Sequence, residues 1–182
     1  MAYTLDHFVA DLDRITRAES DAIAITARVA PLLAQLVEHP DAIPPEYRHS
    51  PEGRRGRFML HRAPQFNVTS VIWRPGDRAA AHNHETWGVI GVVDNEFEET
   101  RYRVTETGGE CARLERLSVT RHGRGAVSCL VPGNEIHAMH NRTACDTVEI
   151  HVYGRDLAGL RRRAWSDDGM EKPLVSGKYL NC

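Results

Sequence analysis

The sequence lacks several features that would place it in a broad functional class. Its 23 Lys and Arg residues are balanced by 25 Asp and Glu residues, so no excess of basic charge is present to bind nucleic acid non-specifically. No apolar run approaches the roughly 18 residues needed to cross a bilayer. Residues 1–12 mix acidic with apolar positions, unlike a secretory signal. We therefore expect a cytoplasmic protein that binds neither nucleic acid nor a membrane.

Paired cysteines and repeats are also lacking. The four cysteines include no C-x-x-C pair, which excludes a zinc knuckle or dithiol redox motif read from spacing, and we expect reduced thiols. The 182 residues, of which 41% are hydrophobic and 26% charged, match one ordinary globular domain. We expect a monomer or a weak homo-oligomer.

The N-terminal segment has the periodicity of amphipathic helices. Apolar residues spaced three and four apart follow Thr4, a plausible N-cap. Ser20 can cap a second segment, and Pro31 suits the first turn of a further helix. Residues 39–56 hold four prolines and many charges, which is typical of a connector. Residues 1–56 are thus expected to be helices and a connector that pack on the rest of the chain.

From residue 57 onwards, short apolar or alternating runs are separated by turns rich in Gly, Asn, Asp and Pro. This pattern predicts an all-β sandwich or barrel. The expected strands are FMLHR, NVTSVIW, WGVIGVV, EFEETRYRV, ARLERLSV, AVSCLV and TVEIHVY. Residues 155–169 are too charged for a core strand and are expected to wrap the barrel as a short helix or an arm. Residues 57–182 would then form a barrel with a C-terminal arm, within one structural domain.

Histidines are concentrated in the second half of the chain, where six of the ten lie between residues 82 and 151. His82 and His84 stand two apart, so on an extended strand both side chains project from one face and can chelate one ion. Two surface histidines are the alternative reading of such a pair. His137, which comes after a turn between two expected strands, supplies a third histidine.

Three other residues near these histidines are not expected to bind an ion. Glu85 points to the other face of a strand from His84. His140 is expected to support the site or lie on the surface. His122 lies in a glycine-flanked turn and is expected to be exposed to solvent.

The spacing of the histidines resembles the two motifs of the cupin superfamily, a small jelly-roll barrel that holds a metal in its interior. The matching residues are Gly76, His82, His84, Pro132, His137 and Asn141. The sequence has Gly88 where the first motif usually has a glutamate ligand, and Asn95 where that motif ends in glycine. Asn134 replaces a glycine of the second motif, a change that Asn tolerates because it visits left-handed backbone conformations.

The resemblance implies a cupin double-stranded β-helix with His82, His84 and His137 as metal ligands. Without the carboxylate, three neutral imidazoles remain, which suit Fe(II), Zn, Cu or Ni. Three protein ligands leave coordination positions of the metal open for a substrate, which indicates a catalytic rather than a structural metal site.

One expected strand carries a second polar group. Glu149, His151 and Tyr153 alternate and therefore share a face, which we expect to look into the barrel. A buried carboxylate, imidazole and phenol are costly unless they hydrogen-bond one another or a ligand. A hydrogen-bonded core network without a catalytic role is the alternative.

The H-x-V-Y-G sequence after a three-histidine cupin resembles the thiol dioxygenases, the cysteine dioxygenase family and especially its bacterial 3-mercaptopropionate dioxygenase branch. Those enzymes use non-haem Fe(II) to add both atoms of O2 to a thiol, giving a sulfinate. The resemblance implies that His151 orients Tyr153, whose hydroxyl points towards the substrate. It also implies that Arg162 binds the substrate carboxylate. The neighbouring Arg161 and Arg163 leave open which of the three arginines would do so. A run of arginines that faces solvent is the more frequent case.

Two departures from that family stand out. The family has a serine where this chain has Glu149, and a carboxylate beside His151 should favour imidazolium and change the donor that reaches Tyr153. Residues 87–89 lack the cysteine that animal enzymes crosslink to the tyrosine, so no crosslink is possible there. Two alternatives stay open, which are a three-histidine cupin dioxygenase that cleaves a carbon–carbon bond and a non-catalytic cupin that binds a metal or small molecule.

Overall fold

The computed structural model describes residues 3–51, 53–108 and 111–182. The chain begins with two helices, α1 (Leu5–Ala18) and α2 (Ala22–Val37). Thr4 caps α1 as expected, since its side chain accepts a hydrogen bond from the His7 backbone. No helix of the described residues is long and apolar enough to cross a membrane.

The second helix differs from expectation in two ways. Its N-cap is Asp21 rather than Ser20, because the Asp21 carboxylate accepts the Ala24 backbone N–H. Pro31 lies inside α2 and starts no further helix. A proline in a helix interior costs about 3 kcal/mol, but the residues on both sides, Val29 and Leu33, are fully buried against the barrel, and each such burial contributes roughly 1.5–3 kcal/mol. Packing on the barrel therefore keeps the helix continuous.

The connector holds two short 3₁₀ turns, η1 (Pro40–Ala42) and η2 (Pro45–Tyr47), and leads into the strands. The strands are β1 (Gly56–Arg62), β2 (Asn67–Trp73), β3 (Arg78–His82), β4 (Gly88–Asp94), β5 (Glu96–Gly108), β6 (Cys111–Gly123), β7 (Val127–Leu130), β8 (His137–His140), β9 (Thr147–Tyr153), β10 (Arg161–Trp165) and β11 (Glu171–Val175).

The strands form two sheets that face each other. The order is β1-β2-β9-β4-β7 in one sheet and β11-β10-β3-β8-β5-β6 in the other, and the paired strands are antiparallel. Strands far apart in the chain thus lie side by side, as in the pairs β2·β9 and β3·β8, which is the pattern of a jelly roll. The fold is the cupin double-stranded β-helix that the sequence predicted.

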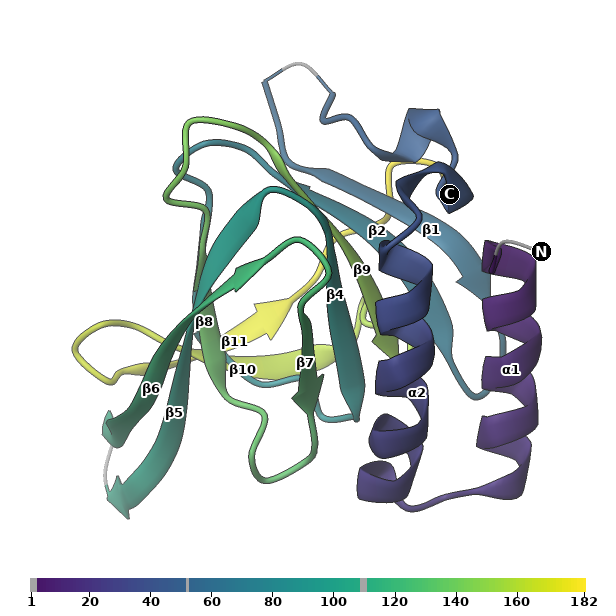
Figure 1. The fold of residues 1–182 in the computed structure, drawn as a ribbon. Coiled ribbons are helices and arrows are strands. Elements are labelled where there is room, and N and C mark those ends of the chain that lie inside the picture. The colour runs from purple at the N-terminus through teal and green to yellow at the C-terminus, as the bar shows by residue number, and fades with distance from the viewer. Residues whose placement is uncertain (1–2, 52, 109–110) are drawn as a thin grey trace.

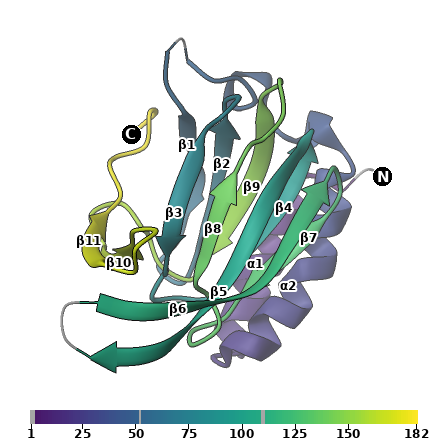
Figure 2. The ribbon, with the colours of Figure 1, turned by 90° about the vertical axis from the view of Figure 1, so that its left-hand side faces the viewer.

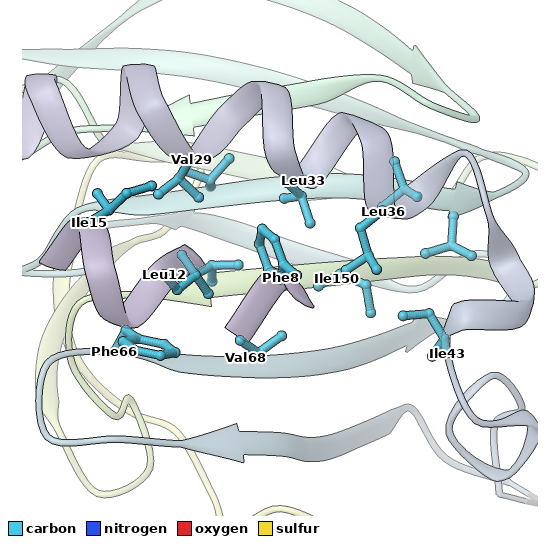
Figure 3. Close-up of a cluster of buried hydrophobic side chains, with 14 of the residues drawn as sticks. Phe8, Leu12, Ile15, Val29, Leu33, Leu36, Ile43, Phe66, Val68 and Ile150 are labelled. Carbon is cyan, nitrogen blue, oxygen red and sulfur yellow. The ribbon is translucent and has the colours of Figure 1, made fainter. Parts of the chain in front are cut away.

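The two helices cover the outer face of the five-stranded sheet, away from β10 and β11 (Figures 1 and 2). Apolar residues of both helices, including Phe8, Leu12 and Leu33, pack against Val68 and Ile150 of that sheet (Figure 3). The alternate residues of β9 consequently face the barrel interior, where Tyr153 belongs to the inner apolar cluster. This alternation confirms that Glu149, His151 and Tyr153 share the inward face.

The segment after β9 is neither a helix nor a loose arm. Residues 161–165 form β10, which pairs with β3 and β11 at one end of the barrel (Figure 2). A strand can hold three consecutive arginines here because only the middle one is buried, whereas Arg161 and Arg163 are exposed. A charged segment can therefore join a sheet when a single charged side chain points inward.

Candidate functional site

The three histidines of the cupin motifs meet inside the barrel. His82 ends β3 and pairs with His137 at the start of β8, while His84 lies two residues after His82. One ligand nitrogen from each lies within 4.8 Å of the other two. Asn141 ties the two motifs together, because its side chain donates to the carbonyl of Trp73 at 2.9 Å and its own carbonyl accepts from Gly76 at 3.0 Å.

The hydrogen bonds of the rings leave the inward nitrogens free. His82 Nδ1 donates to the carbonyl of Ala80 at 2.8 Å, and His137 Nδ1 donates to Glu99 Oε1 at 2.6 Å. The buried Nε2 of His137 has no hydrogen-bond partner among the described residues. A buried polar atom without a partner is costly, and a metal ion would supply one.

The protonation of the three rings also suits a metal. Burial lowers the pKa of His82, His84 and His137. A charge on His137 would lower the pKa of His82 and His84 further, whereas Glu99 opposes the effect of burial on His137. The rings are therefore neutral near pH 7, which is the form that binds metal ions. The residues present fit a divalent first-row ion whose identity the donor set leaves open.

Glu99 is the part of this site that the sequence reasoning missed. Its buried carboxylate accepts hydrogen bonds from His137 and from Ser128 Oγ at 2.9 Å. It also forms an ion pair with Arg101 Nε at 2.8 Å and contacts His122 Nε2 at 3.0 Å. Burial raises the pKa of Glu99, but the hydrogen bonds of His122 and His137 and the charge of Arg101 together hold it well below its ordinary value. Glu99 thus fixes the ring of a proposed ligand. The alternation that places Glu99 on the same face as Phe97 was the available signal.

The prediction that His122 is exposed to solvent is wrong. Its side chain is only 15% exposed because it stacks on Phe97 and meets Glu99. His140 lies outside the histidine cluster, as does Glu85, whose carboxylate is 43% exposed and accepts from Asn83. Glu85 also has a left-handed backbone, with φ at 58°.

A cavity of about 400 Å³ opens beside the cluster and brings the other candidate residues to it. His82, His84, His137, His151, Tyr153 and Arg162 line this cavity. Apolar side chains, among them Val71, Leu157 and Leu174, complete its wall. These polar residues come from separate segments of the chain, and the fold gathers them around one space.

Four side chains form a continuous hydrogen-bonded chain along the barrel interior. Trp73 Nε1 donates to Glu149 Oε2 at 2.7 Å, the same oxygen meets His151 Nε2 at 2.6 Å, and His151 Nδ1 meets the Tyr153 hydroxyl at 3.0 Å. The order Glu, His, Tyr is the one the sequence indicated, and Trp73 is an addition. When Nε2–H of a neutral His151 donates to Glu149, Nδ1 accepts from Tyr153.

Tyr153 joins this chain to the histidine cluster. Its ring stacks on that of His84, with centroids 5.1 Å apart and planes 16° apart. Burial raises the pKa of Tyr153 above its ordinary value of 10.0, so the hydroxyl keeps its proton near pH 7. Tyr153 is therefore a protonated hydrogen-bonding group at the wall of the cavity.

The position of Tyr153 explains one departure from the usual cupin motif. Gly88 pairs with Tyr153 across β4 and β9, and a Cβ at residue 88 would lie 2.6 Å from Cε1 of the Tyr153 ring. A glutamate at residue 88 would therefore collide with the tyrosine. At the end of the first motif, Asn95 has a φ of 64°, the left-handed conformation that the usual glycine adopts easily. In the second motif the left-handed residue is Gly133 and not Asn134.

Arg162 is the buried arginine of β10 and is 5% exposed. Its Nη1 donates to the carbonyl of Asn83 at 2.7 Å, and its Nη2 donates to Ser176 Oγ. The Nε atom is buried without a hydrogen-bond partner among the described residues. Of the three consecutive arginines only Arg162 is buried, because the flanking Arg161 and Arg163 face solvent.

No family model matches the chain. Among solved structures, it is similar to a cupin superfamily protein from Desulfitobacterium hafniense, with 11% identity, 64% of this chain and 87% of that chain covered, and a TM-score of 0.44. A protein with a double-stranded β-helix domain from Klebsiella pneumoniae has 17% identity, coverage of 73% and 93%, and a TM-score of 0.44. A cupin family protein from Methanocaldococcus jannaschii has 11% identity, coverage of 58% and 86%, and a TM-score of 0.44.

Likenesses of this size say nothing about what the chain binds or catalyses, and the fold assignment rests on the strand order given above. The chain thus has the double-stranded β-helix fold of the cupins, and its three-histidine cluster could hold a metal ion.

Proposed function

We propose that the protein is a non-haem Fe(II) dioxygenase that adds O2 to the sulfur of a small carboxylate-bearing thiol, such as 3-mercaptopropionate or cysteine, to give a sulfinate. The observation that carries this proposal is the convergence of the histidine cluster, Tyr153 and Arg162 on one cavity of about 400 Å³. The reaction balances without a further reductant, because the sulfur loses the four electrons that O2 gains and both oxygen atoms remain on it.

Each group would have a separate task. Bound Fe(II) would favour the thiolate form of the substrate and provide the redox chemistry with O2. Arg162 would hold the carboxylate through a charge-assisted hydrogen bond and so fix the direction of the thiol. The protonated Tyr153 hydroxyl would donate to or accept from the reacting groups, with its direction set by His151.

The hydrogen-bonded chain favours a catalyst over a binding protein. A metal that only stiffens the barrel needs no ionisable groups beyond its ligands, yet the Glu149 carboxylate and the His151 imidazole are buried behind Tyr153. Burying such groups costs free energy even when they are hydrogen-bonded. We infer that the role of these buried hydrogen-bonded groups is to position the Tyr153 hydroxyl for catalysis.

Oxygen uptake by iron-loaded protein, measured against a panel of small thiols, tests the proposal. We expect uptake with at least one carboxylate-bearing thiol, equimolar sulfinate by mass spectrometry, and no uptake without thiol. Uptake with a diketone or phenol but no thiol would replace the proposal with a carbon–carbon cleaving dioxygenase, and iron-loaded protein inert towards all of them would favour a binding protein.

A variant pair tests the ligand assignment in the same assay. His82→Ala should lose bound iron and turnover, whereas His140→Ala, which removes a histidine outside the cluster, should keep both. Full iron content and activity in His82→Ala would contradict the ligand set.

A further inference from the structure

The cavity beside the histidine cluster is strongly cationic. Four arginines line it, namely Arg55, Arg57, Arg78 and Arg162, and no Asp or Glu is among the described residues that do so. A cavity with low-dielectric walls and one sign of charge concentrates ligands of the opposite sign. The number of positive charges therefore bears on the charge of the substrate.

The arginines differ in whether a carboxylate of the chain already pairs with them. Arg55 is compensated, because its Nε lies 3.3 Å from Asp77 Oδ2 and its guanidinium lies 3.7 Å from the centre of the Trp73 ring. Arg57, Arg78 and Arg162 have no ion pair with any described Asp or Glu within 4.0 Å. Arg162 is moreover buried, with an unpartnered Nε atom.

Two of these three unpaired guanidinium groups, those of Arg162 and Arg57, are held by neighbouring residues of the segment after β11. Arg162 Nη2 donates to Ser176 Oγ, and Arg57 Nη1 donates to the carbonyl of Gly177 at 2.9 Å. Arg57 also lies over the Tyr179 ring, with 4.3 Å from its guanidinium carbon to the ring centre. Ser176 and Gly177 are consecutive residues, and both arginines line the one cavity of about 400 Å³.

Like charges held together in this way are unfavourable in the free protein. Burial lowers the pKa of Arg162 and the positive charge of Arg57 lowers it further, whereas Tyr153 and Glu135 raise it. A ligand with one carboxylate would neutralise only one of the two groups. A ligand with two carboxylates would pair both and remove their repulsion.

We propose that the substrate is a dianionic thiol, a small mercapto-dicarboxylate, with one carboxylate on Arg162 and the second on Arg57. This inference rests on the proposed function for the role of the thiol and of Arg162, and it adds Arg57 as a residue that determines specificity. Mercaptosuccinate has this chemistry and serves as the probe, while 3-mercaptopropionate is its analogue with a single carboxylate.

The kinetic test compares the two thiols in iron-loaded protein. We expect kcat/KM to be at least about tenfold higher for mercaptosuccinate, the size of one additional charge-assisted hydrogen bond. The ratio of the two kcat/KM values should fall about tenfold in Arg57→Gln and partly recover in Arg57→Lys. Equal use of both thiols, or an unchanged ratio in Arg57→Gln, would overturn the proposal while leaving thiol oxidation intact.

Arg62→Gln is the matched control. Arg62 lies on the same strand, its guanidinium lies 5.8 Å from the centre of the same Tyr179 ring, and it pairs with Asp156 at 3.0 Å rather than lining the cavity. The variant changes the net charge by the same amount, and the ratio should stay within about threefold of that of the wild type. A fall as large as that in Arg57→Gln would show that overall charge, not a second carboxylate site, sets the preference.

A binding measurement without turnover separates this inference from the proposed function. Isothermal titration calorimetry of the protein with succinate and with propionate, neither of which has a thiol, should show tighter binding of succinate by at least about tenfold. Arg57→Gln should abolish that difference. If no thiol is oxidised but succinate still binds in this way, the dianion site stands and the thiol dioxygenase proposal fails. Equal binding of succinate and propionate would overturn the dianion site.

Discussion

Glu99→Gln should loosen the proposed metal site without touching a ligand. The substitution keeps the shape of the side chain but removes the negative charge that receives His137 Nδ1 at 2.6 Å. Loss of such a supporting carboxylate typically lowers metal affinity by 10- to 100-fold, or about 1.4–2.7 kcal/mol. It also leaves Arg101, whose side chain is 17% exposed, as a charge with only neutral partners. Breaking a buried pair costs roughly 3–5 kcal/mol, and we expect the lower end because Arg101 is partly exposed.

Both effects can be measured on one preparation. Competition with a chromophoric chelator gives the metal affinity, and urea denaturation of the metal-free protein gives the free energy of unfolding. Glu98→Gln is the control, because the neighbouring carboxylate points to the other side of the sheet and pairs with Arg142, which is 56% exposed. This control should lose less than about 1 kcal/mol and no metal affinity. If Glu99→Gln bound metal within about threefold of the wild type, the reasoning on His137 would be refuted.

Three further predictions concern the tyrosine and the histidines. Tyr153→Phe should retain metal and lower kcat roughly tenfold, since it removes only the hydroxyl that meets His151; an unchanged kcat would assign the hydrogen-bonded chain to the core. Gly88→Ala should also retain metal but displace the Tyr153 ring, because its Cε1 atom would lie 2.6 Å from the new Cβ. A normal kcat and an unshifted tyrosine in a crystal structure of this variant would contradict the expected clash. Metal-free protein should lose stability as pH falls below about 6.5, because burial lowers the folded-state pKa of His82 and His84, so that the unfolded chain binds more protons there. Urea denaturation at about pH 7.5 and about pH 5.5 measures this loss, and equal stability at both values would contradict it.

The longer elements could be predicted from the sequence because their periodicity reflects what they bury. The expected strand NVTSVIW matches β2, and TVEIHVY matches β9. The short strands β3 and β8 were not anticipated as elements, since five residues of RAAAH and four of HAMH carry too little alternation to be recognised. The histidines themselves were found because their spacing is a motif, independent of strand assignment.

Glu99 and Trp73 were missed for a different physical reason. Their roles depend on partners distant in sequence, as the contact of Trp73 Nε1 with Glu149 Oε2 and that of Glu99 with His137 show. Polar residues in an alternating strand are ordinarily assigned to the solvent face. Inside this barrel the alternation of β5 instead turns a charged side chain inward, where the guanidinium of Arg101 and the Nδ1–H of His137 compensate it.

The three consecutive arginines of β10 show how the two-residue period of a strand determines which side chain faces the cavity. As a helix or an irregular arm, residues 161–163 would present their charges in several directions, and none would be distinguished from the others. As a strand, they alternate, so Arg162 alone enters the cavity while its two neighbours remain in solvent. Arg162 and Arg57, which belongs to β1, are both hydrogen-bonded to the Ser176–Gly177 segment. A shift of one residue in the register of β10 would move Arg162 to solvent and point its two neighbours inward, so the antiparallel pairing of β10 with β3 is what sets the charge of the cavity.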